Sequence, residues 1–307
     1  MQVIFDQVTF SYAAKQRKPL KRAKAQKKAL EHIEFDSSKA ALKDVSLTIE
    51  SGEFFGVIGH TGSGKSTFIR HLNGIAIPTQ GSVTVGGLST AIKEDRAEIR
   101  SKIGMVFQYP DYQLFAATVA EDIAYGPRNF GVEEAEIAKR ITQVSEMIGL
   151  DYDALKERSP FELSGGQKRL VAIAGVLVMQ PEILVLDEPT AALDPRGKAH
   201  LLQILRKLNE QGMTIIMVSH NMDDVAEDAD RVLVLDHGSV FALGTPAEVF
   251  QPANAIELRR IGLGIPEAAH FAQALQAEGF PIDGASIYRE ADLLSAIEAA
   301  FGGETRV

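Results

Sequence analysis

A glycine-rich segment directly follows the apolar run 54–58 and has the spacing G-x-x-x-x-G-K-S. It reads Gly59, His60, Thr61, Gly62, Ser63, Gly64, Lys65 and Ser66. Such a turn lets several backbone N–H groups point at one phosphate group, and the helix that it opens adds positive potential. We expect Lys65 to reach the β- and γ-phosphates of a nucleotide, the Ser66 hydroxyl to bind Mg²⁺, and Thr67 to contact the α-phosphate. His60 occupies a free position of the motif and is interpreted as a loop residue.

Two adjacent acids stand at the end of another apolar run. Asp187 ends the segment Ile-Leu-Val-Leu-Asp, and Glu188 follows at once. This pattern places the Asp187 carboxylate at the C-terminal tip of a buried strand, where a phosphate-loop protein holds its Mg²⁺ ligand. We therefore expect Asp187 to face the metal and Glu188 to face an attacking water molecule. The alternative for Glu188 is a structural acid that caps a helix or forms a salt bridge.

Apolar runs and helical patterns alternate through most of the chain. Strands are predicted at 2–10, 42–49, 54–59, 101–108, 182–189, 214–220 and 231–238, with helices at 66–73, 133–148, 165–179 and 196–211. This order predicts a largely parallel sheet with helices on both faces. Residues 246–307 differ in character. Pro266 and Gly279 bracket one helix, and a stripe from Leu293 to Phe301 marks another, which predicts a small helical domain at the C-terminus.

Composition excludes several classes of protein. The 307 residues are 45% hydrophobic, carry a net charge of −9 and include no cysteine. These values argue against global disorder, a bare nucleic acid as main partner, disulfides and cysteine chemistry. The longest purely apolar run, 170–179, is half the ~20 residues that a membrane helix needs, and no secretory signal is visible. A soluble cytoplasmic protein is expected.

One strongly basic block lies between the first two predicted strands. Residues 15–28 hold eight basic side chains and no acid. A solvated loop is one interpretation. Contact with anionic lipid headgroups is the other, at ~1 kcal/mol per basic residue near the surface.

The segment Leu163-Ser164-Gly165-Gly166-Gln167 resembles the LSGGQ signature of ATP-binding-cassette (ABC) ATPases. Further matches to that family are Tyr12, Gln108, Ala192-Leu193-Asp194 and His220. The resemblance implies an α/β fold of the P-loop NTPase, ABC nucleotide-binding type, with a mixed sheet core, an antiparallel β subdomain and a helical signature subdomain. This domain is expected to span 1–245 with a basic insertion at 15–40, and 246–307 to form a helical dimerisation extension.

A narrower resemblance is to the ATPases of energy-coupling-factor (ECF) transporters, closest to the second of their two paralogues. It rests on the segments 107–131, 158–177 and 244–250. The family implies vitamin or transition-metal uptake through a transmembrane coupling protein and a substrate-binding membrane protein, with the ATPase peripheral on the cytoplasmic face. Two departures are Ala192, where glycine is frequent, and Leu170, where the subgroup often has a basic residue.

The resemblance also implies a site shared between two ATPase subunits, which form a homodimer or a heterodimer. One subunit supplies ATP contacts from Tyr12 and 59–67. The catalytic residues of that subunit are Glu188, His220 and Gln108, and its Mg²⁺ ligands are Ser66, Gln108 and Asp187. The partner supplies Ser164, Gly165, Gly166 and Gln167, with Asp194 linking the two sites.

Side chains after Gln108 are candidates for docking on the coupling protein: Tyr109, Tyr112, Leu114 and Phe115. Ordinary packing is their alternative. Two other functions stay open: an ATPase of another ABC importer class, and a soluble ABC ATPase acting on ribosomes or DNA. The single LSGGQ and the absence of heptads disfavour the second. The transported substrate is not encoded here, because specificity resides in another subunit.

Overall fold

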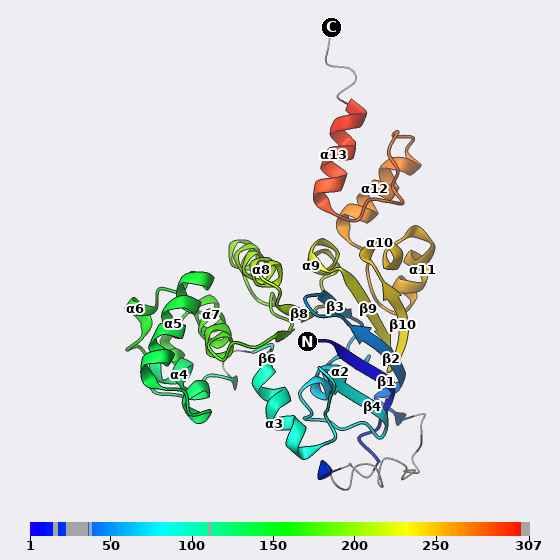
Figure 1. Cartoon of the computed structure of the whole chain (residues 1–307). Helices are drawn as coiled ribbons and strands as arrows, with labels where there is room; N and C mark the ends of the chain where they lie inside the picture. The colour runs from blue at the N-terminus through cyan, green and yellow to red at the C-terminus, as the bar shows by residue number, and fades with distance from the viewer. Residues whose placement is uncertain (15–17, 23–35, 37–38, 110–111, 302–307) are drawn as a thin grey trace.

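The computed structural model describes residues 1–14, 18–22, 36, 39–109 and 112–301 (Figure 1). Most of the basic insertion predicted at 15–40 lies outside the described residues. Within it, Arg22 is paired with the buried carboxylate of Asp95. Neither interpretation of the basic block, solvated loop or lipid contact, is therefore tested by the structure.

A six-stranded sheet forms the centre of the molecule. Its order is β10 (Ser239–Gly244), β9 (Arg231–Asp236), β3 (Phe54–Ile58), β8 (Thr214–Val218), β7 (Ile183–Asp187) and β6 (Ile103–Val106). All neighbouring pairs are parallel except β9 and β10, which form an antiparallel hairpin. The predicted, largely parallel sheet is therefore confirmed. The predicted strands 101–108 and 182–189 are longer than the observed strands β6 and β7, which end at Val106 and Asp187.

Both faces of this sheet are buried, because successive side chains of each strand enter two different apolar layers. In β3, Phe54 and Ile58 join the layer beneath the helices, whereas Phe55 and Val57 join the opposite layer. The same alternation holds in β7, β8 and β9. The strands consequently read as continuous hydrophobic runs, and their carboxyl ends meet along one edge.

A second, antiparallel sheet covers one face. Its order is β2 (Leu42–Ile49), β1 (Val3–Phe10), β4 (Gln80–Val85) and β5 (Leu88–Ser89). Residues of α2 (Lys65–Leu72) and α3 (Lys93–Lys102) pack in the apolar layer between the two sheets. The antiparallel subdomain predicted from the family resemblance is thus present.

Helices on the other face include a group set to one side of the sheet (Figure 1). This group contains α4 (Val119–Asn129), α5 (Glu134–Ile148), α6 (Tyr152–Leu155), the 3₁₀ turn η3 (Pro160–Glu162) and α7 (Gly165–Leu177). The sheet itself carries α8 (Pro195–Glu210) and α9 (Met222–Asp228). The group corresponds to the predicted helical signature subdomain.

The C-terminal helices divide between two hydrophobic cores. Leu258 of α11 (Pro252–Arg260) and Val249 of α10 (Pro246–Val249) belong to the main core. By contrast, α12 (Glu267–Ala277) and α13 (Glu290–Phe301) share a small core of their own. Figure 1 shows these two helices projecting beyond α9 to α11. Among the described residues, no helix combines the length and hydrophobicity needed to cross a membrane.

Candidate nucleotide site

The loop between β3 and α2 closes on itself where only glycine fits. Gly59 has φ 157°, and a Cβ there would lie 2.3 Å from the Ser63 hydroxyl and 2.5 Å from the Leu235 carbonyl oxygen. Gly64, the N-cap of α2, has φ 114° and would clash with the Ala41 carbonyl. These conformations strain any residue with a side chain. The sequence Gly59–Lys65 therefore builds a tight cradle at a helix N-terminus, which is an anion-binding geometry.

The ammonium group of Lys65 crosses this cradle. Its Nζ donates hydrogen bonds to the carbonyl oxygens of Gly59, at 2.6 Å, and of His60, at 3.1 Å. Burial lowers the pKa of Lys65, and the nearby carboxylates of Glu188 and Asp187 oppose that shift. Lys65 therefore lies on the phosphate loop within electrostatic reach of both acids.

The two acids lie at the carboxyl end of β7, next to β8. Burial and the neighbouring Glu188 raise the pKa of Asp187, while Lys65 and Arg70 lower it. Glu188 has φ 50°, a left-handed conformation that is rare for residues other than glycine. One of its oxygens, Oε2, lies 2.5 Å from the His220 Nδ1 and accepts the His220 backbone N–H at 3.2 Å. His220 thus holds one oxygen of a nearly buried carboxylate at the carboxyl end of β7.

Tyr12 stands beside the first turn of α2. Its hydroxyl lies 3.2 Å from the Thr67 hydroxyl and accepts a hydrogen bond from Arg70 at 3.2 Å. The ring packs edge-on against Phe10 and is 56% exposed. It therefore offers a flat apolar surface beside the phosphate loop, as base stacking requires.

The signature segment begins α7 with a capping box. Ser164 accepts the Gln167 N–H, and the Gln167 side chain accepts the Ser164 N–H. Both Gly165 and Gly166 are exposed, and a Cβ on either would meet nothing within 4 Å. Within the described part of the chain, no hydrogen bond joins this segment to the phosphate loop. The glycines consequently present an open helix N-terminus to solvent.

Gln108 and Asp194 lie on the loops that follow β6 and β7. Asp194 caps α8 by accepting the Gly197 N–H at 2.8 Å. Ala192 adopts φ 61°, which explains why glycine suits its position. The structure brings together the phosphate loop, Asp187, Glu188 and His220, whereas Asp194 stays at the exposed start of its helix.

Sequence reasoning missed Arg169, which is buried in α7. Its guanidinium donates to the backbone carbonyls of Gln108 at 3.1 Å, Glu188 at 3.3 Å and Ala191 at 3.3 Å. Burial lowers its pKa. A signal was present, because Arg169 shares a helix face with Ala172 and Ile173, three and four residues on. A charge on an apolar face predicts a buried partner.

Oxygen ligands suitable for Mg²⁺ occur at three predicted positions. They are the Ser66 hydroxyl, the Gln108 amide and the Asp187 carboxylate. Mg²⁺ prefers hard oxygen donors of this kind, together with water and nucleotide phosphates. The donor set therefore fits the ion.

Comparisons with known proteins show which family the chain belongs to. The family model described as "ABC transporter" matches residues 42–191. The chain is 53% identical over 246 residues to the energy-coupling factor transporter ATP-binding protein EcfA2 of Clostridium perfringens, covering 80% of this chain and 86% of the relative. It is 45% identical over 273 residues to the EcfA2 protein of Lactococcus lactis subsp. cremoris, covering 86% and 93%.

Solved structures show the same fold. The cbiO1 protein of Clostridium perfringens, part of an ABC transporter complex, superposes with a TM-score of 0.68 at 34% identity, over 85% of this chain and 96% of that one. A dimeric ATP-binding cassette in a post-hydrolysis state, bound to ADP and Pi, has a TM-score of 0.65 at 31% identity. It covers 79% of this chain and 98% of its own. The predicted P-loop ABC fold is confirmed.

Proposed function

The chain is an ABC ATPase and belongs to the family of energy-coupling factor transporter ATP-binding proteins, and on this premise we propose how its residues work. Backbone N–H groups of Gly59–Ser66 and the Lys65 ammonium hold the β- and γ-phosphates of ATP. Tyr12 stacks on the adenine, and Thr67 contacts the α-phosphate. The observation that carries these assignments is the glycine cradle at the N-terminus of α2, which the Lys65 ammonium spans by hydrogen bonds to the Gly59 and His60 carbonyls.

Hydrolysis needs a base beside the γ-phosphate. Glu188 has one oxygen bonded twice to His220, and its other oxygen has no hydrogen-bond partner among the described residues. That oxygen can orient a water molecule and take its proton. His220 is 69% exposed in its side chain and contacts the γ-phosphate from the opposite ring nitrogen. Ser66, Gln108 and Asp187 would hold Mg²⁺, which supplies charge neutralisation on the β- and γ-phosphates.

The signature glycines complete the site of a second subunit. Their exposed helix N-terminus presents N–H groups that bind no other segment among the described residues, which suits the γ-phosphate of a head-to-tail partner. Ser164, Gly165, Gly166 and Gln167 therefore act in trans, and Asp194 links the two sites. The partner is a second ABC ATPase, either another copy or a paralogue.

An aromatic surface next to Gln108 is the proposed contact to the membrane. Tyr109, Tyr112 and Phe115 are 57%, 86% and 58% exposed. Leu114 is only 4% exposed and belongs to the main core, so its predicted docking role is wrong and packing explains it. We place this surface against a transmembrane coupling protein on the cytoplasmic face. A substrate-binding membrane protein would select the cargo, a vitamin or a transition-metal ion.

The assignment of the phosphate loop is tested with Lys65→Ala. We expect ATP binding to be lost in equilibrium dialysis, because the cation aimed at the β- and γ-phosphates is removed. Lys139→Ala removes an exposed lysine of α5 and should bind ATP as the unmodified chain does. Equal affinity in Lys65→Ala would contradict the assignment.

The membrane assignment is tested separately. A tagged full chain should co-purify two membrane proteins after mild detergent extraction. The triple variant Tyr109→Ser, Tyr112→Ser and Phe115→Ser should lose them while still binding ATP. Ile256→Ser, which removes an exposed apolar side chain elsewhere, should retain them. Retention by the triple variant would remove the aromatic surface from the interface.

A further inference from the structure

The hairpin turn between β9 and β10 is fixed against the phosphate loop. Asp236 pairs with Ser239, which leaves His237 and Gly238 as a two-residue turn. Both have positive φ, 46° and 83°, as a type I′ turn requires. The Gly238 N–H donates to the Ser63 carbonyl at 2.9 Å. The turn therefore holds the His237 side chain beside the loop that binds phosphate.

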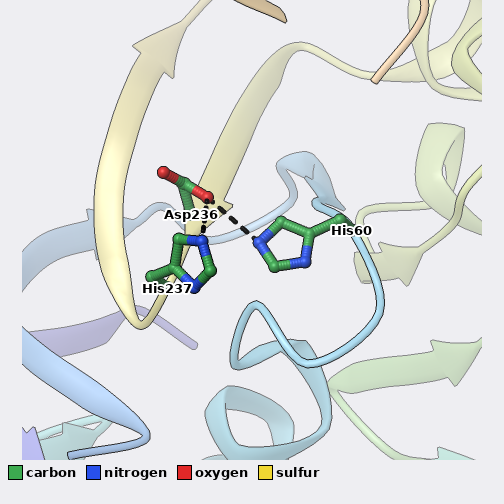
Figure 2. A group of neighbouring side chains, drawn as sticks. All are labelled: His60, Asp236 and His237. Carbon is green, nitrogen blue, oxygen red and sulfur yellow. Dashed lines mark hydrogen bonds and ion pairs between the residues drawn. The ribbon is translucent and has the colours of Figure 1, made fainter. Parts of the chain in front are cut away.

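Three ligand-type side chains converge at this junction. Figure 2 shows His60 of the phosphate loop pointing toward Asp236 and His237 of the hairpin. Their ligand atoms all lie within 4.8 Å of one another, and no other such group of three occurs among the residues that the structure describes. The His60 Nε2 lies 3.0 Å from the Asp236 Oδ1, and the His237 Nε2 lies 3.7 Å from the same oxygen.

The hydrogen bonds of His60 fix which ring nitrogen can bind a cation. Its Nδ1 lies 2.8 Å from the Thr61 carbonyl oxygen, which only accepts, so Nδ1 carries a proton. In a neutral ring, Nε2 then presents a lone pair, and it faces a carboxylate oxygen. Two acceptors in contact repel each other unless a positive charge lies between them. A backbone carbonyl that orients one nitrogen so that the other ligates is the usual arrangement of metal-bound histidine.

We propose that His60, Asp236 and His237 form a binding site for a divalent transition-metal ion such as Zn²⁺. Two imidazole nitrogens and one carboxylate suit such ions better than Mg²⁺, which prefers oxygen. Ligand atoms of a tetrahedral Zn²⁺ lie roughly 3.3 Å apart, given bonds of about 2.0 Å. The distances from the Asp236 Oδ1 to the His60 and His237 nitrogens, 3.0 and 3.7 Å, bracket that value. His237 is 77% exposed in its side chain, so its ring is open to solvent and water can complete the coordination.

Bound metal would tie the phosphate loop to the β9–β10 hairpin through side chains, in addition to the hydrogen bond from Gly238 to Ser63. The site differs from the Mg²⁺ site assigned to Ser66, Gln108 and Asp187. The proposed metal site also does not depend on the proposed function, because metal binding is measured without nucleotide.

The test is a titration of the full-length chain with Zn²⁺, without nucleotide or Mg²⁺, followed by calorimetry. We expect one ion per chain. His60→Asn, Asp236→Asn and His237→Asn should each weaken binding by about tenfold or more. Asparagine tolerates the left-handed conformation at 237, so the last variant keeps the turn. His270→Asn removes an exposed histidine of α12 and should bind as the unmodified chain does.

A second readout uses Co²⁺ in place of Zn²⁺. The visible absorption of bound Co²⁺ should show nitrogen and oxygen ligands and should disappear in the double variant His60→Asn, His237→Asn. The proposal is overturned if the double variant binds either ion as well as the unmodified chain. It is also overturned if the unmodified chain binds none, because the cluster is then an imidazolium–carboxylate ion pair.

Discussion

Glu188 combines three properties that its position in a sequence motif does not specify. It is nearly buried, it adopts a left-handed backbone conformation, and it receives two hydrogen bonds from His220 on one oxygen. A strained conformation of this kind persists only where the surroundings fix it. Here the two hydrogen bonds from His220 hold the Glu188 carboxylate at the carboxyl end of β7.

Replacement of Glu188 by glutamine should separate binding from hydrolysis. Glutamine keeps the size of the side chain and a hydrogen bond to water, but it cannot accept the proton. Single-turnover hydrolysis should fall by ~10²–10⁴, while MgATP affinity is retained. Gel filtration in MgATP should show an accumulated dimer, since hydrolysis no longer reopens it.

Asp187→Asn is the matched comparison for that variant. It weakens metal coordination, so it should lower MgATP affinity as well as turnover. Near-normal turnover in Glu188→Gln would instead leave Glu188 as a structural acid beside the metal ligand.

His71 should make the stability of the nucleotide domain dependent on pH. The ring is fully buried in α2, and its Nδ1 lies 2.7 Å from the Thr67 carbonyl. Burial lowers the pKa of His71 from 6.5 to about 4. Between pH 6.5 and about pH 4 the unfolded chain binds a proton on this histidine that the folded chain does not bind. The free energy of unfolding is therefore highest above about pH 6.5 and decreases as the pH falls toward 4.

The corresponding variant is His71→Leu, compared by urea unfolding at about pH 7 and about pH 5. The unmodified chain should lose ~2 kcal/mol more than the variant over this interval. His270→Leu removes an exposed histidine and should keep the pH dependence of the unmodified chain. If the free energy of unfolding changes equally with pH in the unmodified chain and in His71→Leu, His71 is not the group that makes stability depend on pH.

Arg169 connects three elements that must act together. From the signature helix α7 it binds the backbones of the loop after β6, through Gln108, and of the segment after β7, through Glu188 and Ala191. A movement of α7 relative to the sheet would therefore shift the backbone at Glu188, the residue that we propose as the catalytic base. Arg169 therefore links the helix that the signature segment begins to the loops that carry Gln108 and Glu188 in the same chain.

Arg169→Lys should lower turnover while leaving nucleotide affinity nearly unchanged. A lysine ammonium lacks the planar fork of arginine and cannot satisfy the same three carbonyls. Each lost buried hydrogen bond costs about 1–3 kcal/mol. We therefore expect turnover to be about tenfold lower and the chain to unfold at a lower urea concentration. Arg128→Lys, at an exposed ion pair with Glu134, is the control and should change neither. Unchanged turnover in Arg169→Lys would restrict Arg169 to a packing role.

The elements differ in how far the sequence alone specifies them. Buried strands such as 183–187 and the phosphate loop are readable, because hydrophobic runs and a fixed glycine spacing encode them locally. The β4 strand, Gln-Gly-Ser-Val-Thr-Val, escapes detection because pairing with β1, far away in sequence, decides its conformation. The contacts of Arg169 and the pairing of His60 with Asp236 are missed for the same reason, since these partners lie 19 to 176 residues away.

At the scale of the whole chain, the boundary between the cassette and its extension is clearer in packing than in sequence. Every nucleotide motif ends before residue 221, and the pattern change at 246 suggested a division there. Leu258 and Leu263, however, belong to the main core. The separately packed unit begins with α12, which meets the cassette through a hydrogen bond from the Glu267 N–H to Asp223.

Deletion of residues 266–307 should therefore leave the cassette folded and able to bind ATP, but weaken dimerisation. The removed helices carry Phe271 and Leu294, which are 51% and 55% exposed and would pack against a second subunit. Light scattering across a concentration series should show that the truncated chain dissociates at a protein concentration at least about tenfold higher than the full-length chain. The double variant Phe271→Ser, Leu294→Ser should reproduce that shift in the full-length chain. Equal dimerisation of truncated and full-length chains would assign the extension a role other than dimer formation.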